Sequence, residues 1–316
     1  MSTSKKHTTE EKLLIHAPID VVRELVLDVE TWPQLHPGAI HAEYLERTGE
    51  AELIQHWALV DDRTVRTWKA RRWSEDGGNR ILFRHEPVAP PFAEMGGGFT
   101  FEAHDGGSTL VHMRHDFELL TQDDALAATR LEAMRRGTGV YLDTLRYAAE
   151  NRDELARCII SFEDSLFVSG AIEDAYQYLY EADKWPERIP HVKALTLEES
   201  VPGIQFFDMD TVSGDGAAHT TRSVRICLPH HKIVYKQIKT PAMLAAHTGH
   251  WEFVQTPEGV ESRARHTATI IPDRTHLLGE GTTVQGARNY LRRVLGTNSL
   301  GNLRLAKEYA ETRAGF

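Results

Sequence analysis

The sequence predicts an α+β protein built from two tandem copies of one domain, each a curved antiparallel sheet of seven strands wrapped around a long C-terminal helix. Two observations carry this prediction. A Trp-Pro pair occurs at Trp32-Pro33 and again at Trp185-Pro186, 153 residues later (185 − 32). After each pair, six runs with a period of two residues follow one another without an intervening helix, and one long helical pattern then closes the half.

Further matches keep one order along the chain, which indicates a duplicated domain rather than a chance repeat. At the offset of 153 the matched pairs are Ile19 and Ile172, Pro37 and Pro190, Glu46 and Glu199, Thr67 and Thr220, and Arg72 and Arg225. Offsets of 152 and 151 then match Gly97 with Gly249 and His115 with His266. We therefore predict domains at residues 1–154 and 155–316, in line with a usual size of about 150 residues.

Each half begins with a strand and a short helix, which in the first half are Lys12–His16 and Ile19–Val29. Asp20 stands in the first turn of this helix, where the helix dipole favours a negative charge. Because a proline disfavours the α conformation in the residue before it, we expect Trp32-Pro33 to end the helix and Pro37 to close a second short turn. The second half repeats this pattern over Cys158–Phe162 and Ile172–Ala182.

Six further strands follow in each half, separated by turn signals such as Asp105-Gly106-Gly107. Those of the first half are predicted near Ala39–Arg47, Glu52–Val60, Thr64–Ser74, Arg80–Glu86, Gly97–His104 and Thr109–Leu119. Those of the second half are predicted near Val192–Ser200, Gln205–Val212, His219–Leu228, Lys232–Lys239, His247–Gln255 and Val260–Ile271. Long helices over about Asp123–Asn151 and Leu277–Arg313 complete the halves. A sheet curled around one helix leaves a hollow in which a ligand binds.

Composition narrows the class of protein. The content of 41% hydrophobic and 26% charged residues is typical of a soluble globular protein. No apolar run approaches the roughly 20 residues of a membrane span, and residues 1–11 lack a signal-peptide core, so we expect a cytoplasmic location. The net charge of −10 disfavours nonspecific nucleic-acid binding. Two cysteines, Cys158 and Cys227, are too few for a disulfide scaffold or a zinc site, and we expect no metal.

Strand alternation predicts which side chains face the hollow, since successive residues point to opposite faces. In the last strand of each half, the apolar face includes one histidine, His115 in the first half and His266 in the second. The strand before it turns Phe99 inward in the first half, and His247 and Trp251 in the second. An inward histidine also fits a hydrogen-bonded core residue, and both interpretations stay open.

A third strand carries an arginine in both halves, on a face with aromatic or hydroxyl residues. This face comprises Trp68, Ala70 and Arg72 in the first half and Thr221, Ser223 and Arg225 in the second. Alternation alone does not decide whether the face is inward, and the arginine also fits a surface salt-bridge partner. Trp32 and Trp185 fit a packing anchor at the helix end as well as a ligand contact.

The order of elements, the Trp-Pro pair after the first helix and the strand Trp68-Lys69-Ala70-Arg71-Arg72 resemble the polyketide aromatase/cyclases of bacterial type II polyketide synthases. These proteins belong to the helix-grip superfamily of START-like and Bet v 1-like domains. The duplication and the stretch Lys239–Trp251 resemble the two-domain subclass. Single-domain relatives carry Trp-x-Ser-x-Arg, with the arginine implicated in cyclisation. Here the first half has Ala70 for the serine, and the second has Thr221 for the aromatic residue.

The resemblance implies a cofactor-independent polyketide cyclase and dehydratase that closes and aromatises the first ring of a ketoreduced poly-β-ketone. The substrate is then carried by an acyl carrier protein, and other synthase subunits are partners. We expect an arginine to stabilise the enolate, a histidine to move protons and a serine to bind a carbonyl. The candidates are Arg225, Arg72, His266, His247, His115 and Ser223. The expected substrate contacts are Trp68, Trp251, Phe99, Trp32, Trp185 and Thr221.

Other interpretations of the same hollow stay open. A non-catalytic carrier of lipid or another hydrophobic small molecule has the same fold class, although it has little reason to bury arginine and histidine. A scaffold that only holds a synthase together would need none of the inward residues. The pairs Arg135-Arg136 and Arg292-Arg293 on the long helices fit a docking site for an acidic carrier protein, or a solvated helix face.

Overall fold

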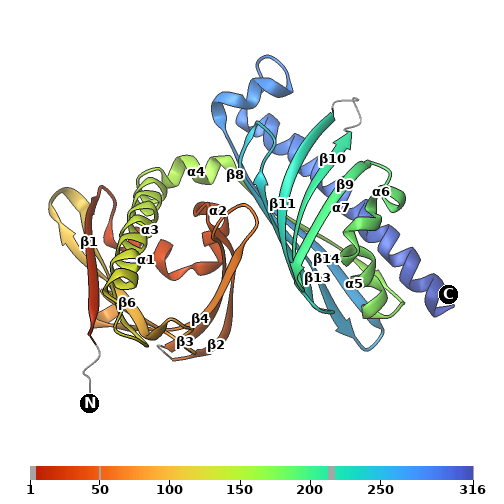
Figure 1. Cartoon of the computed structure of the whole chain (residues 1–316). Coiled ribbons are helices and arrows are strands. Elements are labelled where there is room, and N and C mark those ends of the chain that lie inside the picture. The colour runs from red at the N-terminus through yellow and green to blue at the C-terminus, as the bar shows by residue number, and fades with distance from the viewer. Residues whose placement is uncertain (1–4, 50, 213–217, 316) are drawn as a thin grey trace. The chain divides into compact units, whose positions relative to one another are not determined.

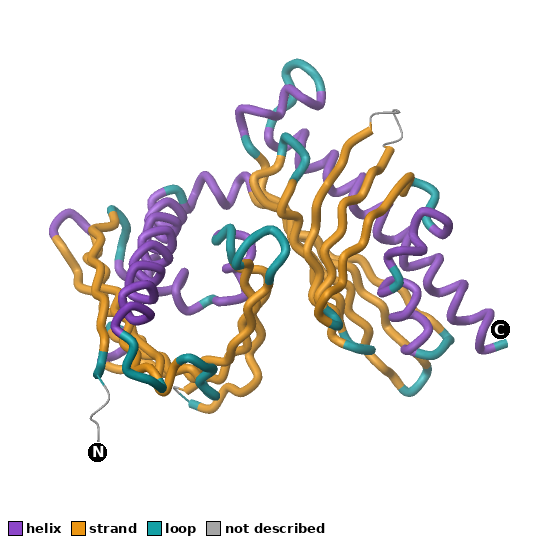
Figure 2. Tube along the Cα trace, viewed as in Figure 1, coloured by secondary structure: helices purple, strands orange, loops and turns teal. Residues whose placement is uncertain are grey.

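The structure is a computed structural model, described over residues 5–49, 51–212 and 218–315 (Figure 1). The chain divides into two compact units, Met1–Arg152 and Asp153–Phe316. The predicted boundary between residues 154 and 155 lies two residues from this division. In each unit the strands form one sheet that curves around its long helix (Figure 2).

The first unit contains a seven-stranded antiparallel sheet in the order β1-β7-β6-β5-β4-β3-β2. Its elements are β1 (His7–Ile15), α1 (Ile19–Leu27), η1 (Val29–Thr31), α2 (Trp32–Leu35), β2 (Ala39–Thr48), β3 (Ala51–Leu59), β4 (Val65–Glu75), η2 (Asp76–Gly78), β5 (Arg80–His85), β6 (Phe92–His104), η3 (Asp105–Gly107), β7 (Ser108–Leu119) and α3 (Asp124–Glu150). A short helix, α4 (Arg152–Cys158), follows α3.

The second unit repeats this order, with its sheet running β8-β14-β13-β12-β11-β10-β9. Its elements are β8 (Ile159–Val168), α5 (Ile172–Tyr180), η4 (Ala182–Lys184), α6 (Trp185–Arg188), β9 (Val192–Val201), β10 (Ile204–Val212), β11 (Ala218–Leu228), β12 (Lys232–Lys239), β13 (Leu244–Thr256), β14 (Gly259–Ile270), η5 (Pro272–Leu278) and α7 (Val284–Ala314). The predicted fold class is confirmed.

The expected role of the Trp-Pro pair was wrong. Helix α1 already ends at Leu27, a 3-10 turn follows, and Trp32-Pro33 begins α2 instead of ending α1. A proline is well suited to the first helical turn, because its fixed φ is helical and its missing N–H would have had no partner there. Trp185 begins α6 in the same way.

The hydrophobic core of each unit lies between the sheet and the long helix. In the first unit, Val22 and Val26 of α1 pack with residues of β7 and with Leu142, Leu145 and Ala149 of α3. Leu303, Ala306 and Ala310 of α7 do the same in the second unit, each 161 residues after its counterpart (303 − 142, 306 − 145, 310 − 149). The two long helices therefore match at an offset of 161. Within the described residues, no helix is long and apolar enough to span a membrane.

Candidate functional site

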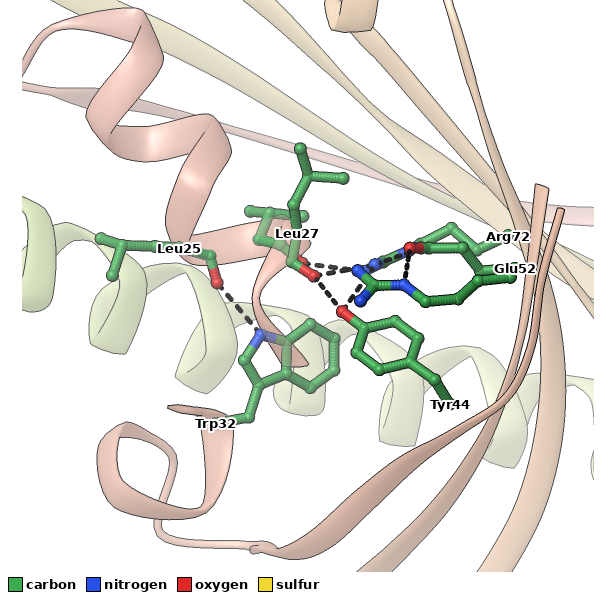
Figure 3. A network of polar contacts seen from close by, with 8 residues as sticks. Leu25, Leu27, Trp32, Tyr44, Glu52 and Arg72 are labelled. Carbon is green, nitrogen blue, oxygen red and sulfur yellow. Dashed lines mark hydrogen bonds and ion pairs between the residues drawn. The ribbon is translucent and has the colours of Figure 1, made fainter. Parts of the chain in front are cut away.

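Arg72 reaches from β4 to the C-terminal end of α1 (Figure 3). Its Nη1 donates to the carbonyl oxygen of Val26 at 3.1 Å, and its Nη2 to that of Leu27 at 2.7 Å. Its Nε and Nη2 also donate to Glu52 Oε2, at 2.9 and 2.6 Å. The last carbonyls of a helix lack intrahelical partners and carry partial negative charge, so a buried cation there is stabilised.

Arg225 makes the same contact with α5 in the second unit. Its Nη1 and Nη2 donate to the carbonyl oxygens of Leu179 and Tyr180, at 2.9 and 2.7 Å. In place of a carboxylate, Gln205 accepts from Nε at 3.0 Å, and its amide donates to Glu199 at 2.7 Å. Arg225 is fully buried, which lowers the pKa of its guanidinium. An uncharged glutamine thus separates the buried cation from its acid.

The surface salt-bridge interpretation of these arginines is wrong, because Arg72 and Arg225 are only 6% and 0% exposed. In both, all three guanidinium nitrogens donate to oxygens of the protein. What the contacts establish is that each arginine fixes the end of a helix against the sheet. A cavity of about 650 Å³ lies beside α1, where Arg72 lines it together with Tyr44 and Glu52.

A column of aromatic rings lies inside the first unit. Trp68 of β4 stacks on His56 of β3, with ring centroids 4.9 Å apart, and on His85 of β5, 6.0 Å away. Trp32 continues the column on the far side of His56 at 5.8 Å. Burial is the main cause that lowers the pKa of His56 to about 3 and that of His85 to about 4. Both imidazoles are therefore neutral at pH 7.

His56 and His85 were not among the predicted site residues. His56 pairs directly with Trp68 across β3 and β4, so its side chain must share the face of Trp68. His85 pairs with Ala70, two residues further along the same face. Alternation within one strand does not give this information, because it requires the register between strands.

His115 lies on β7, opposite the long helix. Its Nδ1 is 3.3 Å from the hydroxyl of Thr138 on α3, and burial lowers its pKa to about 4. Phe99 and Tyr141 line the same interior, with ring centroids 5.6 Å apart. The buried hydroxyl of Tyr141 has no hydrogen-bond partner among the described residues. A neutral imidazole and an unsatisfied hydroxyl thus share this interior.

The second unit holds a buried network of two histidines. Nδ1 of His266 is 2.6 Å from the hydroxyl of Tyr235 and 3.2 Å from Nε2 of His247. Nδ1 of His247 contacts Gln237 Oε1 at 3.0 Å. Burial lowers the pKa of His247 to about 4 and that of His266 well below its usual range. Both rings are neutral at pH 7, and Tyr235 stays protonated because burial raises its pKa.

A glycine is required on β13 at the position opposite Tyr235. A β-carbon at Gly249 would lie 2.3 Å from the Tyr235 hydroxyl oxygen and 2.2 Å from the carbonyl oxygen of Arg265. Gly249 is the cross-strand partner of Tyr235, and Gly97 stands opposite Phe83 in the first sheet. The glycine leaves room for the aromatic ring, which brings the hydroxyl to His266.

Several other predicted site residues of the second unit are buried. Ser223 is buried on β11, between Thr221 and Arg225, and Trp185 lies under Arg225 at 5.0 Å. Some buried polar atoms have no hydrogen-bond partner in the described part of the chain. They include Trp185 Nε1, Thr221 Oγ1, Trp251 Nε1, His266 Nε2 and Asn302 Oδ1. Buried polar atoms are nearly always hydrogen-bonded, so this interior is suited to a polar occupant.

In each arginine pair of the long helices, one arginine forms an ion pair with a carboxylate. Arg136 is exposed and forms an ion pair with Glu132 at 3.1 Å. Arg292 binds Asp164 at 2.6 Å and lies 4.4 Å over Phe162. Arg135 and Arg293 are exposed. In the residues that the structure covers, no three His, Cys, Asp or Glu side chains are placed to hold one metal ion.

The comparisons with known proteins agree with this architecture. Residues 6–145 match the family model described as polyketide cyclase / dehydrase and lipid transport. The chain is 37% identical to the granaticin polyketide synthase bifunctional cyclase/dehydratase of Streptomyces violaceoruber, over 96% of this chain and 94% of that one. It is 39% identical to the actinorhodin polyketide synthase bifunctional cyclase/dehydratase of Streptomyces coelicolor, over 97% and 98%.

Two solved structures are similar over almost the whole chain. One is the di-domain ARO/CYC StfQ from the steffimycin biosynthetic pathway, with a TM-score of 0.87, 52% identity and coverage of 98% of this chain and 100% of that one. The other is the di-domain ARO/CYC BexL from the BE-7585A pathway, with a TM-score of 0.83, 34% identity and coverage of 96% and 99%.

Fold and interior together define a tandem helix-grip protein whose hollows are lined by histidines and aromatic residues. The chain belongs to the bifunctional cyclase/dehydratases of polyketide synthases, the two-domain aromatase/cyclases.

Proposed function

We propose that this protein closes the first ring of a carrier-bound, ketoreduced poly-β-ketone by an intramolecular aldol reaction and then aromatises it by loss of water. The observation that carries the proposal is an imidazole at matching positions, half-buried His115 beside Thr138 and buried His266 beside Tyr235, each kept neutral by desolvation. Such an imidazole accepts a proton at pH 7, which an imidazolium does not. The full-length similarity to cyclase/dehydratases supports the same reaction class.

The reaction needs only proton transfers and orientation. An imidazole nitrogen of His115 or His266 removes a proton from a methylene between two carbonyls. The resulting enolate carbon attacks a carbonyl carbon of the same chain, a C–C bond forms, and the imidazolium returns its proton to the alkoxide. Removal of the second proton from the same carbon and departure of the hydroxyl as water then give the ring double bond. Holding the chain in one reactive geometry supplies up to about 7–11 kcal/mol.

The remaining residues take supporting roles in this proposal. Arg72 and Arg225 are positioning residues, since all three nitrogens of each guanidinium group are hydrogen-bonded to the protein and fix a helix end. His247 orients His266, and Ser223 and Thr221 offer hydroxyls to substrate carbonyls. The apolar walls for the flexible chain are Trp68, Phe99, Trp32, Trp251 and Trp185.

We also propose that an acyl carrier protein delivers the substrate in the cytoplasm, together with the other subunits of the synthase. In this proposal the two domains comprise residues 1–154 and 155–316. Exposed arginines of the long helices, Arg135 and Arg293, suit an acidic carrier protein electrostatically.

Product analysis in a reconstituted minimal synthase tests the function. We expect His115→Gln, His266→Gln or the double variant to lose the aromatic first-ring product and to release compounds of spontaneous cyclisation. His112→Gln is the matched control, because His112 lies on the same strand with its side chain on the opposite face. Unchanged product and yield from the double variant would exclude these imidazoles as the catalytic bases.

A carrier of lipid or another hydrophobic small molecule is the second candidate, because the matching family model also covers lipid transport. Native mass spectrometry of the purified protein distinguishes the two. A carrier retains a copurified ligand and leaves the product pattern of the synthase unchanged, whereas a cyclase changes that pattern.

A further inference from the structure

An arginine that the predicted site did not include lies on the inner face of the first sheet. Arg66 is on β4, two residues before Trp68, and therefore on the same face. Its Cζ atom is 4.6 Å from the centroid of the Trp68 ring. Its charge is among the causes that lower the pKa of His56, His85 and His115, after burial in each case. Because Trp68 stacks on His56 and His85, the guanidinium lies beside these two histidines.

Arg66 is partly shielded from solvent by the protein around it. Its side chain is exposed, and yet desolvation is the largest cause that lowers its pKa. The guanidinium is therefore accessible and only partly hydrated. This is the environment of a residue that lines a ligand site.

A second arginine, Arg130 of α3, approaches from the helix side. Its Cζ is 6.0 Å from the ring of Phe92, at the start of β6, and its buried Nε has no hydrogen-bond partner among the described residues. Repulsion from Arg130 is the second cause that lowers the pKa of Arg66, so the two cations act on each other directly.

Neither cation is neutralised within the described part of the chain, since no carboxylate forms an ion pair with Arg66 or Arg130. Other arginines of β4 and of the neighbouring strand β5 do have such partners. These pairs are Arg71 with Glu46 and Glu86, Arg72 with Glu52, Arg80 with Glu75, and Arg84 with Asp116. Two neighbouring guanidinium groups without a carboxylate partner favour an anion.

We propose that Arg66 and Arg130 form an oxyanion site of the first unit that binds the enolate of a 1,3-diketone. The inference rests on the proposed function, because a poly-β-ketone is a chain of 1,3-diketones. In the step, a C–H bond breaks, its proton moves to a neutral imidazole nitrogen of His85 or His115, and the electron pair spreads over the two carbonyl oxygens. A guanidinium fork fits two oxygens on one side of a planar anion.

The site belongs to the first unit alone. The sequence position that matches Arg66 at the offset of 153 is His219, and the one that matches Arg130 at 161 is Leu291. Leu291 is buried in an apolar cluster with Ala287 and Leu244. The enolate-binding step is therefore assigned to the first unit.

A spectroscopic titration of the full-length protein tests the site without turnover. The probe is a small chromophoric aryl 1,3-diketone, whose enolate absorbs at longer wavelength than the neutral form. With excess protein we expect its apparent pKa to fall by about one, a tenfold increase in enolate at a given pH. Arg66→Gln and Arg130→Gln should return the probe to its free value, and Arg66→Lys should retain part of the effect. Arg136→Gln, on the same helix and already paired, is the control.

The outcomes separate this inference from the proposed function. If neither glutamine variant changes the probe's apparent pKa, the oxyanion site is excluded. If these variants lose binding of inorganic phosphate but leave the diketone titration unchanged, the cations hold a phosphate and the enolate assignment is overturned. If the titration behaves as expected while His115→Gln and His266→Gln still give normal product, the oxyanion site stands and the proposed bases fail.

Discussion

The hydroxyl of Tyr235 lies 2.6 Å from Nδ1 of His266, the shorter of the two contacts that this hydroxyl makes with a histidine. Nδ1 of His247 donates to Gln237 Oε1, an oxygen that only accepts, so Nε2 of His247 is an acceptor. Nδ1 of His266 lies 3.2 Å from that nitrogen and donates to it and to the Tyr235 oxygen, so it carries the ring proton. The lone pair of His266 is then on Nε2, which has no partner among the described residues. The network thus fixes His266 as a proton acceptor whose free nitrogen faces the interior.

Removing this hydroxyl should have two effects. Tyr235→Phe leaves Nδ1 of His266 with a weaker partner, and we expect a loss of about 1–3 kcal/mol in unfolding free energy. The ring proton of His266 should also be less strictly confined to Nδ1, which nitrogen-15 NMR of the histidine side chains detects. Tyr147→Phe, on an exposed face of α3, is the control and should change stability by less than about 0.5 kcal/mol. Equal stability of the two variants would contradict the assignment.

Gln205 occupies the position that Glu52 has in the first unit, but a glutamate at residue 205 should destabilise the protein. Its amide donates to Glu199, so Gln205→Glu removes a donor and places two carboxylates together. We expect the unfolding free energy, measured with urea, to fall by about 2 kcal/mol. Adding Glu199→Gln should restore at least half of the lost unfolding free energy, because this second substitution removes the repulsion between the two carboxylates. No recovery in the double variant would show that the two side chains are not coupled.

Stability should fall on mild acidification. An unfolded histidine titrates near pH 6.5, whereas burial lowers the pKa of His56 to about 3 and of His247 to about 4. Below pH 6.5 the unfolded chain thus binds protons that the folded chain does not, and the unfolding free energy decreases until the folded pKa is reached. Each histidine contributes about 1.4 kcal/mol per pH unit.

Urea unfolding at about pH 7, 6 and 5 measures this dependence. His247→Gln should be less sensitive to pH over that range, because one buried titrating group is gone. A pH dependence identical to that of the original protein would show that His247 is protonated as easily in the folded state as in the unfolded one.

Gly249 should tolerate no side chain. Gly249→Ala places a β-carbon 2.2 Å from the carbonyl oxygen of Arg265 and 2.3 Å from the Tyr235 hydroxyl, so strand and ring must both move. We expect a loss of about 3 kcal/mol or more, typical of overpacking at the upper end. Gly137→Ala is the matched control, because nothing lies within 4 Å of its new β-carbon in α3. That change should stabilise the helix by about 0.5–1 kcal/mol. Similar thermal midpoints for both variants would contradict the packing argument.

The sequence predicts the duplicated sheet and helix well, because both depend on periodicity and on turn residues. It also identifies the positions of His115 and His266, since each lies in an apolar face of one strand. The start of β6 at Phe92 was missed by five residues (97 − 92), because the segment before Gly97 lacks a clear alternation. The start of α7 was also misplaced. This helix begins at Val284 rather than near residue 277, because a 3-10 turn and a loop precede it.

The targets of the arginines could not be predicted. Alternation gives the face of a strand residue but not how far a long side chain extends, and Arg72 extends to carbonyls of a helix 45 residues earlier. The repeated arginine predicts a repeated catalytic cation. It equally fits a repeated helix-end contact, and only the coordinates distinguish the two. Arg66 was not predicted as a site residue, because the matching position of the second half is not an arginine and no repeat marks it.

The two copies hold their matching histidines from opposite sides. His115 is bound by Thr138 on the long helix, and His266 by Tyr235 on the sheet. Ser299, which corresponds to Thr138, turns instead to the carbonyl of Gly296 in its own helix. The duplicated domains thus keep an imidazole at one position of the strand, while the element that anchors it differs between the long helix and the sheet.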